Sequence, residues 1–276
     1  MKENLDIKTV EGFGDEWSRF DQTGMTAAEL TEEFDRYFSV FPWELLPPAA
    51  EGFDLGCGSG RWANLAAQRV GKLHCVDASK AALQVARRNL SGRENVDFHH
   101  ASVDAIPLAN DSMYFGYSLG VLHHVPDTAA GIAACVTKLK PGARFLVYLY
   151  YAFDNRPGWF RAAWKISDFF RALISSLPFG LKKLVTDLIA VLVYLPFAGL
   201  AKALEKSGIN VDNLPLSTYR NHSFYTMRTD SLDRFGTGLE HRFTKKQIKE
   251  MMEEAGLEKV KFREGVPYWC AVGLKK

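Results

Sequence analysis

Residues 53–60, which read Phe-Asp-Leu-Gly-Cys-Gly-Ser-Gly, decide the fold. An apolar run ends there in a glycine-rich turn, the pattern of a buried strand that leads into a helix. Glycine permits left-handed torsions at such a turn and lets a ligand approach the main chain. A dinucleotide-binding turn has a further glycine three residues on, but Arg61 and Ala63 stand at the two positions where it would fall. The spacing therefore predicts a turn built for a nucleoside without a pyrophosphate.

Two acidic residues accompany this turn. Asp54 lies at the end of the expected strand, from where its carboxylate can reach into the turn. Asp77 follows the next apolar run, residues 73–76. An acidic residue after the second strand accepts the ribose hydroxyls in dinucleotide-binding folds. We therefore expect Asp77 to bind a ribose.

Apolar runs and helical patterns alternate over the first half of the chain. This alternation is typical of an α/β protein with a parallel sheet covered on both faces, in which ligands bind at the carboxyl ends of the strands. Before it, Thr26 and Glu29 form a candidate capping box, whereas residues 1–24 have no clear period. We expect strands ending at 55 and at 72–76, 95–100, 113–118 and 143–151, and helices at 60–70, 79–90 and 128–139.

The alternation stops at residue 152. The segment 152–243 is mostly helical in pattern, apolar and aromatic, and it separates the fifth strand from a last helix at 244–255 and strands at 258–264 and 268–274. The predicted organisation is an N-terminal lid and helix (1–48), a cofactor-binding core (49–151), a helical insertion (152–243), and a C-terminal helix and hairpin (244–276).

Residues 54–60, together with Asp77, resemble the cofactor site of class I S-adenosylmethionine-dependent methyltransferases. Residues 101–107, 118–127 and 139–143 resemble further segments of that family, in the family's order. The resemblance implies a Rossmann-like, doubly wound, mostly parallel sheet of seven strands that ends in an antiparallel hairpin. It also implies that the helical insertion, between strands five and six, is a cap that overhangs the active site.

The resemblance implies S-adenosylmethionine as the cofactor and assigns residues to it. The backbone at the three glycines would run beside its methionine portion and ribose. Asp104 would contact the adenine, and the backbone of Leu119 and Gly120 would lie near the amino-acid part. Trp17 is predicted to close over the sulfonium, because an aromatic face attracts a cation. The predicted cofactor-binding residues are Trp17, Asp54, Gly56, Gly58, Gly60, Asp77, Ala78, Val103, Asp104, Leu119 and Gly120.

The predicted catalytic residues are His123, Tyr150, Tyr151 and Asn155. His123 is a candidate base because histidine titrates near neutral pH, although a His-His pair at this loop also belongs to the pattern of the family at large. The tyrosines end the fifth strand, where alternation lets only one of them face each side of the sheet. The alternative for the tyrosines and Asn155 is a polar contact that fastens the insertion.

The bulk composition fits a globular enzyme. The chain has 276 residues, of which 47% are hydrophobic, and a net charge of +2. Such a balance, without a basic stripe, argues against nucleic acid as a partner and favours a small-molecule substrate. The four cysteines lie far apart, so neither a disulfide framework nor a metal site is expected. The N-terminal residues do not form the apolar stretch of a signal peptide, so we expect the cytoplasm; the oligomeric state is open.

Residues 188–201 contain no charged side chain. A membrane-spanning helix needs about 20 apolar residues, and this run is shorter and contains a proline. Three interpretations stay open: a buried helix of the insertion, a groove for a greasy substrate, and a surface that contacts a membrane.

Three functions are consistent with the residues. The first is in-line methyl transfer to a small hydrophobic metabolite, in which the enzyme mainly positions the nucleophile. The second consumes the cofactor itself: its amino group attacks its own γ-carbon, which gives azetidine-2-carboxylate and methylthioadenosine. The third is a non-catalytic module that binds the cofactor.

Overall fold

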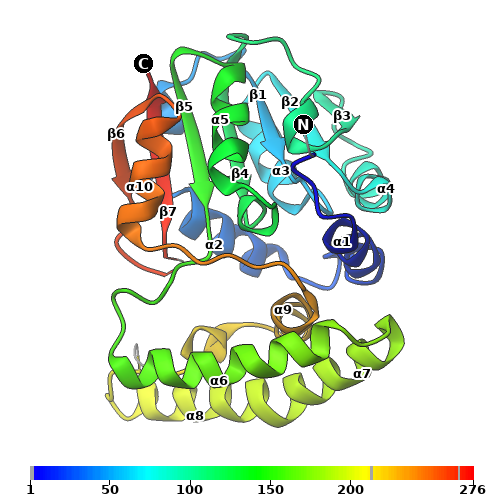
Figure 1. Ribbon diagram of the computed structural model, residues 1–276, viewed down its shortest axis with the longest axis vertical. Coiled ribbons are helices and arrows are strands. Elements are labelled where there is room, and N and C mark those ends of the chain that lie inside the picture. The colour runs from blue at the N-terminus through cyan, green and yellow to red at the C-terminus, as the bar shows by residue number, and fades with distance from the viewer. Residues whose placement is uncertain (1–2, 212–213, 267) are drawn as a thin grey trace. The chain divides into compact units, whose positions relative to one another are not determined.

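The computed structural model describes residues 3–211, 214–266 and 268–276, and the chain forms two compact units (Figure 1). The first, the sheet unit, comprises residues 3–22, Leu30–Ala152 and Leu239–Lys276. The second, the helical unit, comprises Thr23–Glu29 and Phe153–Gly238. The long insertion in the sequence thus forms most of a unit of its own.

The sheet unit is built on one seven-stranded sheet in the order β3-β2-β1-β4-β5-β7-β6. The pairs from β3 to β5 are parallel, whereas β7 runs antiparallel to both β5 and β6. The predicted fold class, a mostly parallel seven-stranded sheet with a terminal hairpin, is therefore confirmed. The strands are β1 (Glu51–Leu55), β2 (Lys72–Asp77), β3 (Val96–His100), β4 (Met113–Leu119), β5 (Leu139–Tyr148), β6 (Leu257–Phe262) and β7 (Cys270–Lys275).

Helices cover both faces of this sheet, and each face has its own apolar core. Phe34, Trp62 and Leu83 belong to one core, and Ile132 and Met252 to the other. Figure 1 shows α5 and α10 in front of the sheet and α2 behind it. The helices are α1 (Ile7–Arg19), α2 (Ala27–Phe38), α3 (Arg61–Ala66), α4 (Lys80–Asn89), α5 (Thr128–Lys138) and α10 (Lys245–Glu254), with short 3-10 turns at Trp43–Leu45, Ala67–Arg69, Val103–Ala105 and Leu122–His124.

Two glycines let the central strands interlock. Gly52 of β1 pairs with Phe115 of β4, and Phe53 pairs with Gly116. A Cβ atom on Gly52 would lie 2.3 Å from the Phe115 ring, and one on Gly116 would lie 2.3 Å from the Phe53 ring. Both phenylalanines are fully buried. Each ring therefore fills the space that a side chain opposite it would need.

Two N-terminal predictions need correction. Residues 1–24 include helix α1, whose N-terminus Asp6 caps by accepting a hydrogen bond from the Thr9 N–H at 2.8 Å. Gly12 and Gly14 weaken the helical pattern in the sequence. At α2, the Glu29 N–H donates to Thr26 Oγ1, but the Glu29 carboxylate accepts hydrogen bonds from Ser223 and Thr226 instead of closing the capping box.

The fifth strand begins and ends earlier than predicted, since it spans Leu139–Tyr148 instead of 143–151. The residues after it leave the sheet pairing with β7 and pair with the segment 239–243. Phe243 N–H donates to Tyr150 O at 2.9 Å, and Ala152 N–H donates to Phe243 O at 2.8 Å. These bonds bring the chain that returns from the insertion alongside the end of β5.

The helical unit contains α6 (Gly158–Ser175), α7 (Phe179–Ile189), α8 (Leu195–Lys206) and α9 (Phe224–Gly236), with a 3-10 turn at Ser217–Asn221. A π-helical turn at Ala190–Tyr194 joins α7 to α8 into one helix over Phe179–Lys206. Pro196 has no backbone N–H to donate, and a π-helical turn is one way for a helix to accommodate the missing hydrogen bond. The interpretation of the apolar run as a buried helix is wrong for its large side chains, since Leu188 and Leu192 are 50% and 69% exposed.

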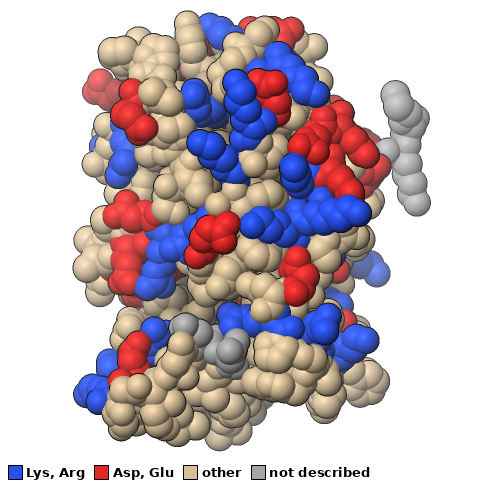
Figure 2. Space-filling view, turned by 90° about the vertical axis from the view of Figure 1, so that its left-hand side faces the viewer, with Lys and Arg blue, Asp and Glu red and all other residues tan. Residues whose placement is uncertain are grey.

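The charged side chains are mixed in sign over much of the surface. On the face viewed in Figure 2, Lys and Arg are interspersed with Asp and Glu. The mixture agrees with the balanced sequence, which has 34 basic and 32 acidic residues.

The interlocked strands predict that Gly116→Ala destabilises the protein more than an alanine in open space. The new methyl group would overlap the Phe53 ring, and overpacking of this kind costs about 1–3 kcal/mol. Gly92→Ala is the matched control, because nothing lies within 4 Å of a Cβ atom there. Thermal and urea denaturation of the two variants would measure the difference. Equal stability of the two variants would contradict the interlocking argument.

Candidate active site

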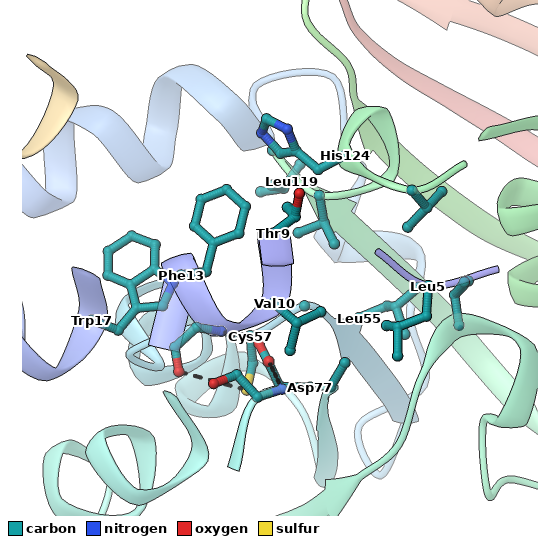
Figure 3. A pocket seen from close by; sticks show the side chains of 18 of the residues that line it. Leu5, Thr9, Val10, Phe13, Trp17, Leu55, Cys57, Asp77, Leu119 and His124 are labelled. Atoms are coloured by element: carbon teal, nitrogen blue, oxygen red, sulfur yellow. Dashed lines mark hydrogen bonds between the residues drawn. The ribbon is translucent and has the colours of Figure 1, made fainter. Parts of the chain in front are cut away.

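A pocket lies at the carboxyl ends of the central strands, inside the sheet unit. Its volume, including the open solvent at its mouth, is about 890 Å³. Figure 3 shows side chains of α1 on one side of it and Cys57 and Asp77 on another. The lining residues are Asn4, Leu5, Thr9, Val10, Phe13, Trp17, Leu55–Ser59, Arg61, Trp62, Asp77–Ser79, Ala101, Val103, Leu119–Val121, His124 and Val125.

The glycine turn after β1 forms one wall of the pocket. Gly56, Gly58 and Gly60 have φ angles of 76°, 54° and 79°, the left-handed region that glycine enters without strain. A Cβ atom on Gly58 would lie 3.0 Å from the indole of Trp17. Gly56 and Gly58 line the pocket, whereas Gly60 packs against Leu90 behind it. The turn therefore needs glycine both for its torsions and for the close approach of α1.

Asp77 ties this turn to the end of β2. Its Oδ2 accepts the Gly58 N–H at 2.8 Å, and its Oδ1 accepts the Ser79 N–H at 2.7 Å (Figure 3). Burial raises the pKa of Asp77, and the two backbone hydrogen bonds oppose that rise. Each carboxylate oxygen has a second lone pair that can accept another donor. Asp77 is thus held in position with acceptor capacity left at the pocket wall.

Asp54 lies beneath the pocket rather than on its wall. Its carboxyl group is buried, and Oδ2 has no hydrogen-bond partner among the residues that the structure describes. Burial raises its pKa to about 8, the nearby Asp77 adds to the rise, and the Tyr117 hydroxyl opposes it. An unpartnered buried carboxyl oxygen is costly, so a water or a cationic group reaching it from the pocket would be favourable.

The predicted adenine-binding segment is only partly on the pocket wall. Val103 lines the pocket, but Asp104 does not. Asp104 accepts hydrogen bonds from Ser102 Oγ at 2.6 Å and from the Asn4 N–H at 3.1 Å. The side chain of Asn4 exchanges two further hydrogen bonds with the backbone of Asp127, each of 2.8 Å. The N-terminal segment is thereby fastened at the pocket by contacts that no sequence pattern indicated.

Three of the predicted catalytic residues, all in the sheet unit, lie outside the pocket lining. His123 is fully buried and stacks on the Tyr150 ring at a centroid distance of 3.8 Å. Burial lowers its pKa well below the usual range, as do His124, Arg242 and His241. Tyr151 forms an isolated bridge with Phe243. None of His123, Tyr150 and Tyr151 lines the pocket, and Asn155 belongs to the helical unit.

His124 lies on the pocket wall in place of His123. Its Nδ1–H donates to the Leu239 carbonyl at 2.7 Å, and its ring packs on Phe13 with centroids 5.0 Å apart. In the neutral ring this bond leaves the lone pair on Nε2. The His-His pair was visible in the sequence, but the phase of the 3-10 turn at Leu122–His124, which selects the histidine that faces the pocket, was not.

A second cluster of polar groups lies on β2 and β3. The ligating atoms of His74, Asp97 and His99 lie within 4.8 Å of one another. His74 also bonds Glu51 Oε1 through Nε2 at 2.7 Å, and Lys72 pairs with Asp97 at 2.7 Å. Lys72 lowers the pKa of Asp97. The carboxylate is thus already paired with an ammonium group.

Comparison with known proteins identifies the domain. Residues 53–147 match the family model described as a methyltransferase domain. This domain belongs to the class I S-adenosylmethionine-dependent methyltransferase family. Curated relatives include ubiquinone biosynthesis O-methyltransferases of Alkalilimnicola ehrlichii, 35% identical over 34% of this chain and 38% of the relative, and of Hahella chejuensis, 29% identical over 56% and 64%.

The match to these relatives thus spans less than two thirds of their length. Solved structures resemble the methyltransferase fold over more of the chain. A candidate methyltransferase in complex with the Trm112 activator from Haloferax volcanii has a TM-score of 0.53, with 13% identity over 95% of this chain and 96% of that one. A candidate methyltransferase from Bacillus halodurans has a TM-score of 0.50, with 16% identity over 84% and 72%. These likenesses support the fold alone.

The geometry at Gly58 predicts that Gly58→Ala weakens the binding of S-adenosylmethionine at least about fivefold. The methyl group would strain a left-handed residue and crowd Trp17, and such strain costs about 1–3 kcal/mol. Gly142→Ala is the matched control, because Gly142 also has a left-handed φ of 78° but faces open space. Isothermal titration calorimetry would compare the two. Equal affinities would show that the turn does not shape the binding wall.

The raised pKa of Asp54 predicts that its contribution to stability depends on pH. Between about pH 4 and 8 the folded protein keeps a proton that the unfolded chain has released, so the free energy of unfolding falls as pH rises through this window. Asp54→Asn should remove this slope, which is at most about 1.4 kcal/mol per pH unit for one proton.

Urea denaturation of the ligand-free protein at several pH values between 5 and 8 would measure the effect. Asp35→Asn is the control, because the side chain of Asp35 is 64% exposed. The advantage of Asp54→Asn over the parent should grow with pH, while that of Asp35→Asn should not. Parallel profiles for all three proteins would refute the assignment.

Proposed function

We propose that this chain transfers the methyl group of S-adenosylmethionine to an oxygen atom of a small apolar metabolite. The observation that carries the proposal is the pair of hydrogen bonds that hold the Asp77 carboxylate against the left-handed glycine turn. This arrangement offers an anchored acceptor for ribose hydroxyls beside backbone that a ligand can approach closely.

The residues of the pocket fit this cofactor. Asp77 would hold the ribose, and the backbone of Gly58 and Gly120 would run beside the methionine portion; Gly120 has a φ of 78° and open space at its Cβ position. The unpartnered Oδ2 of Asp54 would meet the ammonium group through water. Val103 would border the adenine, whereas Asp104, which does not line the pocket, would hold the N-terminal segment beside it through Asn4.

The cofactor supplies a methyl group bonded to a positively charged sulfur, which an acceptor takes by in-line displacement. The chain's own part is to orient the acceptor and to exclude water. Val10, Phe13, Trp17 and Val121 give the pocket apolar walls, and the aromatic rings favour a cation near them. Positioning of this kind is worth roughly 7–11 kcal/mol.

We assign His124 as the general base. Its Nδ1–H is held by the Leu239 carbonyl, which directs the lone pair of the neutral ring to Nε2. A base at the pocket wall would remove the proton of an acceptor hydroxyl, a contribution of about 10²–10⁴-fold. His123, the residue that the sequence suggested, is fully buried against Tyr150.

The acceptor class rests on two observations. The pocket lining is mainly apolar, and the curated relatives are named for O-methylation in ubiquinone biosynthesis. An apolar acceptor with a phenolic hydroxyl agrees with both. The balanced net charge of +2 favours a small molecule over nucleic acid as substrate, and a cytoplasmic location remains part of the proposal.

The test is to incubate the protein with S-adenosylmethionine alone and with panels of phenols, amines and acidic carbon compounds, and to follow the nucleoside products by mass spectrometry. We expect S-adenosylhomocysteine to form only with an acceptor, and most rapidly with apolar phenols. Methylthioadenosine formed from the cofactor alone, above the spontaneous rate, would instead establish the cyclisation. Tight binding without turnover on any panel would favour a non-catalytic module.

Two variants separate binding from chemistry in that assay. Asp77→Asn should raise the Kd for S-adenosylmethionine at least about tenfold, because hydrogen bonds to a charged group contribute about 1.5–3 kcal/mol. His124→Gln should lower kcat about 10²-fold or more with little change in that Kd. An unchanged kcat in His124→Gln would remove this residue from the mechanism and leave the methyl-transfer proposal intact.

A further inference from the structure

In the long helix over Phe179–Lys206, the distribution of large apolar side chains between the buried and exposed sides is the reverse of that in an ordinary globular protein. Surface helices usually bury their large apolar side chains and expose polar ones. Here the buried positions, which recur every three or four residues, carry Thr186, Ala190, Tyr194, Ala198 and Ala201. Apart from Tyr194, many of the large side chains point away from the unit: Leu181, Leu184, Leu188, Val191, Leu192, Leu195 and Leu200 are 44–69% exposed.

Helix α6 repeats this pattern. Its exposed residues include Trp159, Ile166, Phe169, Phe170 and Leu173, each 52–64% exposed, and only one α6 residue, Ile174, is buried. Helix α6 contacts both α7 and α9 within the helical unit. Clusters of exposed aromatic and aliphatic side chains of this extent mark a surface that contacts a protein or a membrane.

The charges around these apolar residues are mostly basic. Residues 158–206 hold seven Lys or Arg and three Asp or Glu, although the whole chain is nearly balanced. All three acids are paired: Asp168 with Arg171, Asp187 with Arg228, and Glu205 with Arg220. Arg161, Lys165, Lys202 and Lys206 are exposed. Basic residues beside exposed apolar side chains match an anionic lipid surface.

The long helix is suited to lie on a bilayer rather than to cross it. By length and hydropathy it could span a membrane, and only 28% of its most apolar window is buried. However, Asp187, the ninth of its 28 residues, pairs with Arg228 of α9 at 2.9 Å, and Lys182 donates to the Gly236 carbonyl at 2.9 Å. A crossing would carry these polar groups into hydrocarbon, where charges are very costly.

We propose that the helical unit docks peripherally on an anionic lipid bilayer. The docking surface, called the lipid face, consists of the exposed apolar residues of α6 and of the helix Phe179–Lys206. Its leucines and aromatic rings enter the headgroup boundary, and the neighbouring Lys and Arg side chains contact lipid phosphates. This binding requires neither the cofactor nor methyl transfer, so it can be tested independently of the proposed function.

The first test is flotation of the purified full chain with vesicles, without S-adenosylmethionine. Vesicles of phosphatidylcholine with phosphatidylglycerol should carry the protein upward, and vesicles of phosphatidylcholine alone should carry less. The double variant Leu188→Asp/Leu192→Asp should bind at least about tenfold more weakly, because the methylene groups of both leucines drive insertion. Leu45→Asp, at a side chain of the sheet unit that is 59% exposed, should bind like the parent.

A second measurement follows Trp159. Lipids brominated near the headgroup should quench its fluorescence, which is isolated by comparison with Trp159→Phe, and high salt should release the protein from the vesicles. Unchanged thermal melting of each variant would establish that it is folded. Three results would overturn the proposal: no flotation of the parent chain, equal flotation of the double variant, or release by detergent alone, which indicates a spanning helix.

Light scattering tests the alternative that a second copy of the chain, rather than lipid, binds the lipid face. A dimer that dissociates in Leu188→Asp/Leu192→Asp, together with a parent chain that does not float, would assign the lipid face to self-association and overturn membrane docking.

Discussion

The architecture of the pocket depends on one carboxylate. Asp77 accepts the N–H groups of Gly58 and Ser79, and so fixes the turn after β1 to the turn after β2. Because Gly58 of the first turn has no side chain, nothing separates its backbone from α1. Trp17 can therefore rest against Gly58, and the aromatic helix becomes a wall of the site. Removal of the Asp77 carboxylate, or addition of a side chain at Gly58, would disrupt this arrangement.

The parts of this arrangement that are local in sequence could be predicted. A strand, a glycine turn and an acidic residue at the end of the next strand are neighbours by topology, because parallel strands end at the same edge of the sheet. The alternation of strands and helices predicted the parallel part of the sheet, whereas the terminal antiparallel hairpin was an expectation from the family resemblance. Gly56, Gly58 and Asp77 could be placed at the pocket for this reason, since their positions depend on the chain within a few residues of each of them.

The rest depends on contacts between distant segments. Asn4 meets Asp104 and Asp127 across about a hundred residues, and nothing in the sequence near Asn4 reports them. The choice between His123 and His124 depends on the phase of a three-residue turn and on the Leu239 carbonyl, which returns to the sheet unit only after the insertion. Composition likewise revealed that the insertion is apolar, but not that its large side chains lie on the outside.

The two proposals meet in the chemistry of the acceptor. An apolar phenol partitions out of water for the same reason that exposed leucines do, since each buried methylene group favours the apolar phase by about 0.8 kcal/mol. A surface that holds the chain on a bilayer would bring it to the phase in which such a molecule is concentrated. This proposal also explains the small residues on the buried side of the long helix. Thr186, Ala190, Ala198 and Ala201 allow the helix to pack closely against the rest of its unit. The leucines that would otherwise form its core remain available for contact with lipid.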